Sequence, residues 1–228
     1  MIKIFDAPTE VLESKEIENR KEITPAVRMS ESEADSYWKS EFEKAHREAM
    51  LEPYDKLLEE IYDVSEDDIS IDYEISDQVK DILSKFQRLE WYLMDDDARL
   101  ETVKKLVDTV GDELGIKDKP KLKISDENED FYGAYDPEKN TIILNKKGFI
   151  DPKELVDTIT HELRHAYQNM RAEKLETHED ALFRVNLENY ISPKQGPDGE
   201  YLNFTDYQNQ YVEVDARAFA DKFTEAMK

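Results

Sequence analysis

The chain contains no cysteine, so it can form neither a disulfide framework nor a thiolate metal site. Basic residues are also few: 31 Lys and Arg stand against 55 Asp and Glu, which gives a formal net charge of −24. Because nucleic-acid binding depends on the neutralisation of phosphates by Lys and Arg, we expect no nucleic-acid partner. An anionic membrane surface would repel this chain for the same reason.

Long apolar segments are absent as well. No stretch approaches the roughly 18 apolar residues that a membrane-spanning helix needs. The first residues, Met-Ile-Lys-Ile-Phe-Asp, lack the apolar core of a secretory signal. We therefore expect no membrane association and, by default, a cytoplasmic protein. Secretion by a route that requires no cleavable signal peptide is kept as an alternative.

Histidine is scarce, with four in the whole chain, and two of the four lie in one motif. His161-Glu162-Leu163-Arg164-His165 has the pattern HExxH. On a helix, residues four apart share one face with β-carbons about 5–6 Å apart, so both imidazoles can reach one metal ion. Two neutral imidazoles suit Zn²⁺, and a Glu between them suits a general base. The motif therefore predicts a zinc site with His161 and His165 as ligands and Glu162 as the catalytic base.

The segment around the motif has the features of a buried helix. Asp151 can cap its start and Pro152 fits its first position, with Glu154 completing an acidic capping box. One side of the expected helix is apolar, with residues at helical spacing: Leu155, Ile159, Leu163, Ala166 and Met170. The motif then falls well inside the helix, where ligand geometry can be held.

The rest of the chain predicts an α+β fold, mostly helical at first and with a small sheet in the second half. Strict alternation of Ile69, Ile71, Tyr73 and Ile75 indicates a half-buried strand, with an extended loop held by its apolar side chains as the alternative. Two strand-like runs around a turn-rich tetrad indicate a hairpin over 131–145. Helices are expected over 30–51 (Trp38 and Phe42 inward), 76–93, 95–114, 177–190 and from 205 onward, and a short strand over 122–124.

A catalytic zinc site needs a third protein ligand. A histidine six residues after His165 is excluded, because that position is Arg171. Glu213 is our first choice, since it lies 48 residues beyond His165 on an expected helix whose small Ala216 and Ala220 permit close helix packing. The alternatives are His178 and Asp215.

A hairpin, then HExxH on a helix, then Glu213-x-x-Ala216 on a later helix resembles the gluzincins, a class of zincin-fold zinc metallopeptidases. The pattern is most similar to the minimal ImmA/IrrE-type peptidases, and it also resembles metallopeptidase domains of bacterial polymorphic toxins. The resemblance covers residues 97–228, which would form a zincin-like domain. Residues 1–96 would form a helical N-terminal region of unknown role.

The resemblance implies a zinc-dependent endopeptidase with a protein or peptide substrate, in which His161, His165 and Glu213 hold Zn²⁺ and Glu162 is the base. The edge strand beside the substrate would comprise Tyr132, Gly133, Ala134 and Tyr135. The chain departs from the pattern at Arg217, where several gluzincin families have Asp, and this arginine could compete for Glu213. A non-catalytic binding or scaffold protein and a secreted toxin or effector protease are therefore kept as alternatives. The oligomeric state is not predicted.

Overall fold

The computed structural model describes residues 31–51, 54–126 and 131–227. The chain divides into two units, residues 1–49 and 50–228. The described part of the first unit lies in helix α2 (Glu31–Met50), whose last residue already belongs to the second unit. This helix confirms the expected one apart from Ser30, which lies outside the described residues. The expected inward orientation of its aromatic residues is wrong, because the exposed fractions are 55% for Trp38 and 76% for Phe42.

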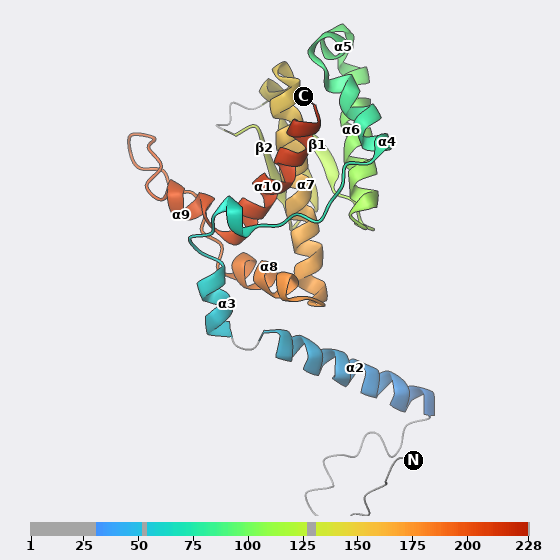
Figure 1. Cartoon of the computed structure of the whole chain (residues 1–228), viewed down its shortest axis with the longest axis vertical. Coiled ribbons are helices and arrows are strands. Elements are labelled where there is room, and N and C mark those ends of the chain that lie inside the picture. Colours follow the sequence, from blue (N-terminus) through green and yellow to red (C-terminus); the bar gives the residue numbers. More distant parts are fainter. Residues whose placement is uncertain (1–30, 52–53, 127–130, 228) are drawn as a thin grey trace, which may run out of the picture. The chain divides into compact units, whose positions relative to one another are not determined.

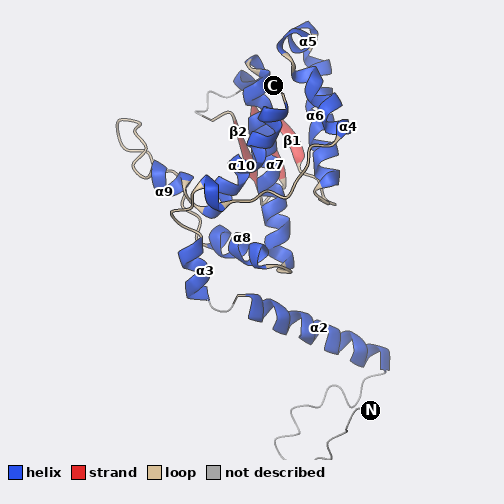
Figure 2. Ribbon diagram, viewed as in Figure 1, coloured by secondary structure: helices blue, strands red, loops and turns tan. Residues whose placement is uncertain are grey.

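The second unit combines helices with one small sheet, as predicted for an α+β fold (Figures 1 and 2). Its helices of eight or more residues are α6 (Asp96–Glu113), α7 (Pro152–Lys174), α8 (His178–Glu188) and α10 (Tyr211–Ala226). The shorter ones are α3 (Tyr54–Glu60), η3 (Glu66–Asp68), α4 (Asp77–Leu83), η4 (Ser84–Phe86), α5 (Arg88–Leu93), η5 (Lys146–Ile150) and α9 (Phe204–Gln208). No described helix has the length and apolar character needed to cross a membrane.

The sheet has the strand order β1 (Lys121–Ser125), β3 (Thr141–Asn145), β2 (Gly133–Asp136). β1 runs parallel to β3, and β2 pairs with β3 in antiparallel register, with Ala134 opposite Ile143. The expected hairpin is therefore confirmed, and β2 lies at an edge of the sheet.

The largest apolar cluster joins the sheet to α4, α6, α7 and α10, while α3 and α8 share a second, smaller one. From β3, Ile142 and Leu144 are fully buried, and α7 packs against both β2 and β3. On its other side α7 lies beside α10, which contributes Phe219 and Phe223 to the same core (Figure 1). The long helix α7 is thus fixed between the sheet and α10.

The second unit begins at Met50, which differs from the boundary expected after residue 96. Phe86 and Trp91 explain this division, because both are fully buried and their rings stack at 4.9 Å. The Trp91 indole also donates a 2.9 Å hydrogen bond to the carbonyl of Phe149. These side chains complete the core under α6 and α7, so the segment that carries them folds with the second half of the chain.

Three expected elements differ in the structure. Residues 69–76 form no strand but the alternative, an extended segment, in which Tyr73 packs on Phe219 and Phe223. The expected single helix over 76–93 is divided into α4, η4 and α5. The last helix begins at Tyr211 after the separate short α9, rather than at Thr205.

Candidate metal centre

The HExxH motif begins in the third turn of α7, a helix of 23 residues, and ends in the fourth. The cap and the first residue are as predicted: the Asp151 carboxylate accepts hydrogen bonds from the backbone N–H groups of Lys153 and Glu154, and Pro152 is the first helical residue. The motif residues are therefore far from the ends of a helix held between sheet and α10, where helices fray least.

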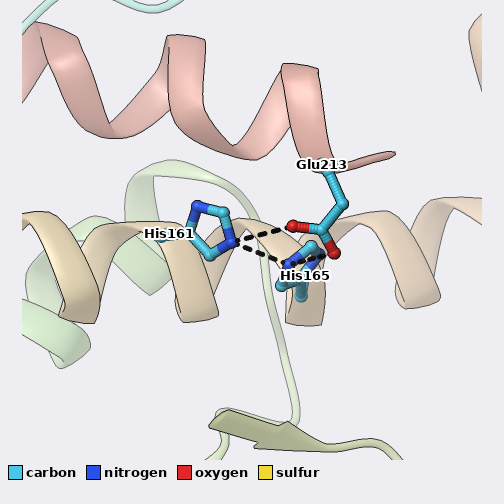
Figure 3. Close-up of side chains that lie close together, drawn as sticks. All are labelled: His161, His165 and Glu213. Atoms are coloured by element: carbon cyan, nitrogen blue, oxygen red, sulfur yellow. Dashed lines mark hydrogen bonds and ion pairs between the residues drawn. The ribbon is translucent and has the colours of Figure 1, made fainter. Parts of the chain in front are cut away.

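Helix α10 brings Glu213 to the motif. Ala216 and Ala220, one turn apart on α10, are buried, and their small side chains permit the close packing against α7 that was expected. Glu213 lies in the first turn of α10 and points at the two imidazoles on α7 (Figure 3). His161, His165 and Glu213 thus form one cluster of ligand-type atoms, all within 4.8 Å of one another.

The separations within this cluster are close to those of a tetrahedral metal site. The Nε2 atoms of His161 and His165 are 3.1 Å apart. The Glu213 carboxylate oxygens lie 3.4 Å from His161 Nε2 and 3.5 Å from His165 Nε2. Bonds of about 2.0–2.1 Å at tetrahedral angles put ligand atoms roughly 3.3 Å apart. The three side chains therefore fit Zn²⁺ in both donor type and spacing.

A buried amide sets the orientation of His165. The Gln168 Nε2 group donates to the Val212 carbonyl at 2.8 Å and to Asp215 Oδ2 at 2.6 Å, so its other terminal atom is the oxygen. That oxygen lies 2.8 Å from His165 Nδ1, which must then carry the proton. The lone pair of His165 is left on Nε2, which faces His161 and Glu213. This is the tautomer that metal binding requires.

Glu213 is held as an anion in this buried position. Burial alone would raise the pKa of its carboxyl, but His165 and His161, when their imidazoles are protonated in the absence of a metal, lower the pKa to about 2. Tyr190 also donates a 2.7 Å hydrogen bond to Glu213 Oε1, and the Tyr207 hydroxyl hydrogen-bonds to Glu213 as well. A charged carboxylate with only 2% of its side chain exposed needs a positive partner, which a protonated imidazole or a metal ion can supply.

Glu162 lies between the cluster and the edge strand. Burial raises the pKa of its carboxyl to about 7, with His165 acting in the opposite direction and Glu213 in the same direction. The backbone N–H of Tyr135 on β2 donates a hydrogen bond to it. A carboxyl with a pKa near neutrality can accept and release a proton, which suits a general base.

The strand residues named from the sequence lie along β2 and just before it. Tyr132 is half exposed, and Gly133, Ala134 and Tyr135 are partly buried. Gly133 has a structural reason that we did not anticipate: a β-carbon there would lie 2.4 Å from Thr158 Cγ2. The glycine therefore lets β2 approach α7 closely.

The two alternative ligands lie elsewhere. His178 is 61% exposed in its side chain and pairs with Glu60 at 2.9 Å. Asp215 is fully buried, but both its oxygens accept hydrogen bonds of 2.7 Å from Arg164. Neither joins the cluster of His161, His165 and Glu213.

Arg217 also points away from the cluster. Its guanidinium donates to the Gln208 carbonyl at 2.8 Å and lies 3.7 Å from Glu66. Among the described residues Arg217 thus contacts Gln208 and Glu66 rather than Glu213, and it does not compete with a metal for Glu213 as its position in the sequence suggested. The outer carboxylate is Asp215, which acts on His165 through Gln168.

Two residues of this centre were missed from the sequence, Gln168 and Tyr190. Gln168 lies three residues after His165, a spacing that places it on the neighbouring surface of the helix, and this was a usable signal. Tyr190 reaches Glu213 from the end of α8, a long-range contact without any local signal.

Comparison of the chain with models of protein families, with curated proteins and with solved structures found no match.

Proposed function

We propose that the protein is a zinc-dependent endopeptidase. The observation that carries this proposal is the convergence of His161, His165 and Glu213 beside Glu162, which in turn contacts an edge strand. The resemblance of the sequence pattern to gluzincins agrees with it.

In this proposal His161, His165 and Glu213 hold Zn²⁺. A zinc ion bound by three protein ligands supplies a Lewis acid that polarises a carbonyl and acidifies water. Glu162 accepts the proton that an attacking water loses and passes it to the leaving amine. Its contact with the Tyr135 N–H fixes the carboxylate beside the strand.

Strand β2 would bind the extended substrate. Asn145 donates its backbone N–H to the Tyr132 carbonyl, so in the alternating pattern of an antiparallel pair the backbone groups of Gly133 and Tyr135 face away from β3. Because the Tyr135 N–H already donates to Glu162, the groups left for a substrate are those of Gly133 and the Tyr135 carbonyl. An extended peptide can add to such an edge through main-chain hydrogen bonds. This would place its scissile carbonyl near Glu162.

Metal content tests the proposal directly. We expect about one zinc per chain in the purified protein and loss of that zinc in Glu213→Ala, because two imidazoles alone make an incomplete site. His178→Ala is the matched control and should keep its zinc, since His178 pairs with Glu60 outside the cluster. Native mass spectrometry measures the zinc content of the wild type and of both variants. If the wild type takes up no zinc, even after reconstitution, the proposal is wrong.

Gln168→Ala should weaken zinc binding by about 10–100-fold without abolishing it, because the His165 ring loses the partner that fixes its tautomer. Competition with a chromophoric chelator gives the affinity. Asn169→Ala is the control, since Asn169 donates to the His165 backbone carbonyl and not to its ring. Equal affinities of the two variants would show that Gln168 has no orienting role.

A further inference from the structure

A series of aromatic rings leads from the metal centre to the surface. It begins at Tyr190, whose hydroxyl donates to Glu213. The ring of Tyr190 lies 6.2 Å from that of Tyr207, Tyr207 lies 6.0 Å from Phe204, and Phe204 lies 5.3 Å from Tyr201. These four residues, Tyr190, Tyr201, Phe204 and Tyr207, are here called the aromatic wall.

Three of the four residues of the aromatic wall are partly open to solvent, including Tyr190 beside Glu213. The exposed fractions are 38% for Tyr190, 42% for Phe204 and 45% for Tyr201. Single exposed apolar residues are ordinary on a protein surface, but contiguous ones are typical of an interaction site. Here the series is also continuous with the cluster of His161, His165 and Glu213, since both Tyr190 and Tyr207 hydrogen-bond to Glu213.

The segment that carries the outer rings is tied together by its own hydrogen bonds. Residues 191–203 project beyond α9 (Figure 1) and contain a bridge between Gln195 and Tyr201. The Asn203 side chain accepts from the Lys194 N–H at 2.7 Å and donates to the Ser192 carbonyl at 3.0 Å.

The same segment is also fixed to the start of α10. The buried Gln210 side chain accepts from the Ile191 N–H at 3.1 Å and donates to the Ile191 carbonyl at 2.9 Å. Since Glu213 lies in the first turn of α10, the rings have a defined position relative to the candidate ligand. A preformed aromatic surface binds apolar groups at a small cost in conformational entropy.

We propose that the aromatic wall binds apolar side chains of the substrate beside the scissile bond, and so directs the enzyme to hydrophobic segments of extended proteins. This inference rests on the proposed peptidase function. The occupant follows from chemistry: aromatic faces next to a carboxylate-rich centre favour aromatic and branched aliphatic groups over acidic ones.

The test uses two internally quenched peptides of equal length, one with Phe and Leu at the central positions and one with Ser and Gly there. The zinc-loaded full chain should cleave the Phe/Leu peptide at least about tenfold faster in kcat/KM, the range expected for apolar contacts. Tyr201→Ser and Phe204→Ser should each reduce that ratio several-fold and leave zinc content unchanged. Leu93→Ser is the matched control, because Leu93 is 78% exposed on α5 outside the wall.

Binding to Glu162→Gln, measured by fluorescence anisotropy of the labelled Phe/Leu peptide, separates this inference from the proposed function. The aromatic wall is supported if Glu162→Gln binds the Phe/Leu peptide more tightly than the Ser/Gly peptide, and if this preference weakens in the double variants Glu162→Gln/Tyr201→Ser and Glu162→Gln/Phe204→Ser. If the wild type nevertheless cleaves neither peptide, only the peptidase function fails. If both peptides are cleaved at similar kcat/KM, and these values do not change in Tyr201→Ser and Phe204→Ser, the role of the aromatic wall is refuted while the peptidase function is retained. If the wild type cleaves neither peptide and Glu162→Gln binds both equally, the aromatic wall and the peptidase function are both overturned.

Discussion

Replacement of Glu162 by Gln is expected to lower peptide hydrolysis by about 10²–10⁴-fold, the usual contribution of a general base, while zinc stays bound. Glutamine keeps the shape of the side chain but cannot take up a proton. Glu162 is outside the cluster of ligand-type atoms, so the metal affinity should change little. Turnover of a quenched peptide and zinc content, measured on the same preparation, check both parts.

Glu154→Gln is the control for this prediction. Glu154 lies exposed in the first turn of α7, so its replacement removes one negative charge from the same helix without touching the centre. Unchanged turnover in Glu162→Gln would exclude Glu162 as the base. Loss of zinc in that variant would instead make Glu162 a ligand, which its contact with Tyr135 argues against.

Asp215→Asn is expected to destabilise the protein by about 3 kcal/mol, because it removes the carboxylate that accepts two 2.7 Å hydrogen bonds from the buried Arg164 guanidinium and leaves the more distant Glu179, 3.9 Å away and 40% exposed, as a weaker partner. The pair is fully desolvated, with 6% of the Arg164 side chain and 1% of the Asp215 side chain exposed. Arg164 also lies over the ring of Tyr167 at 4.5 Å, an additional contact that keeps the loss at the lower end of the usual range. For a unit of this size, thermal denaturation should show a fall in Tm of roughly 6–12 °C.

Two further variants test whether the loss of stability comes from leaving one buried charge without its partner. Arg164→Met combined with Asp215→Asn removes both charges, so this double variant should be more stable than Asp215→Asn alone. Arg184→Gln breaks the exposed pair with Glu188, in which both side chains are 43% exposed, and should cost no more than about 0.5 kcal/mol. If Asp215→Asn and Arg184→Gln lose equally little stability, the buried pair of Arg164 and Asp215 does not stabilise the fold.

The sequence was sufficient for the elements that local chemistry specifies. The cap at Asp151, the proline after it and the apolar spacing of α7 predicted a helix that the structure contains. The hairpin of β2 and β3 followed from a turn-rich tetrad between two strand-like runs. The approach of Glu213 followed from the small residues on α10, which is a packing argument and not a local one.

The errors have one physical origin, which is that local patterns do not reveal long-range partners. Alternation at 69–75 was interpreted as a strand, but the backbone there has no strand partner, and Tyr73 packs on aromatic rings of α10 instead. The apolar residues Trp38 and Phe42 on α2 were expected inside and are exposed. Tyr190 was missed because its contact with Glu213 spans 23 residues.

The contrast between the shared core of α7 and α10 and the loop 191–203 has a consequence for amide exchange. Backbone amides near His165 and Glu213 lie in helices joined by the Gln168 and Asp215 contacts, so we expect them to exchange only in rare openings that disrupt both helices together. The loop is fixed to α10 through Gln210 and is held beyond that point by the contacts of Asn203 and the bridge between Gln195 and Tyr201, so only the amides at its tip should exchange more often. The ligand geometry and the aromatic wall would then both persist while the tip of the loop opens and closes.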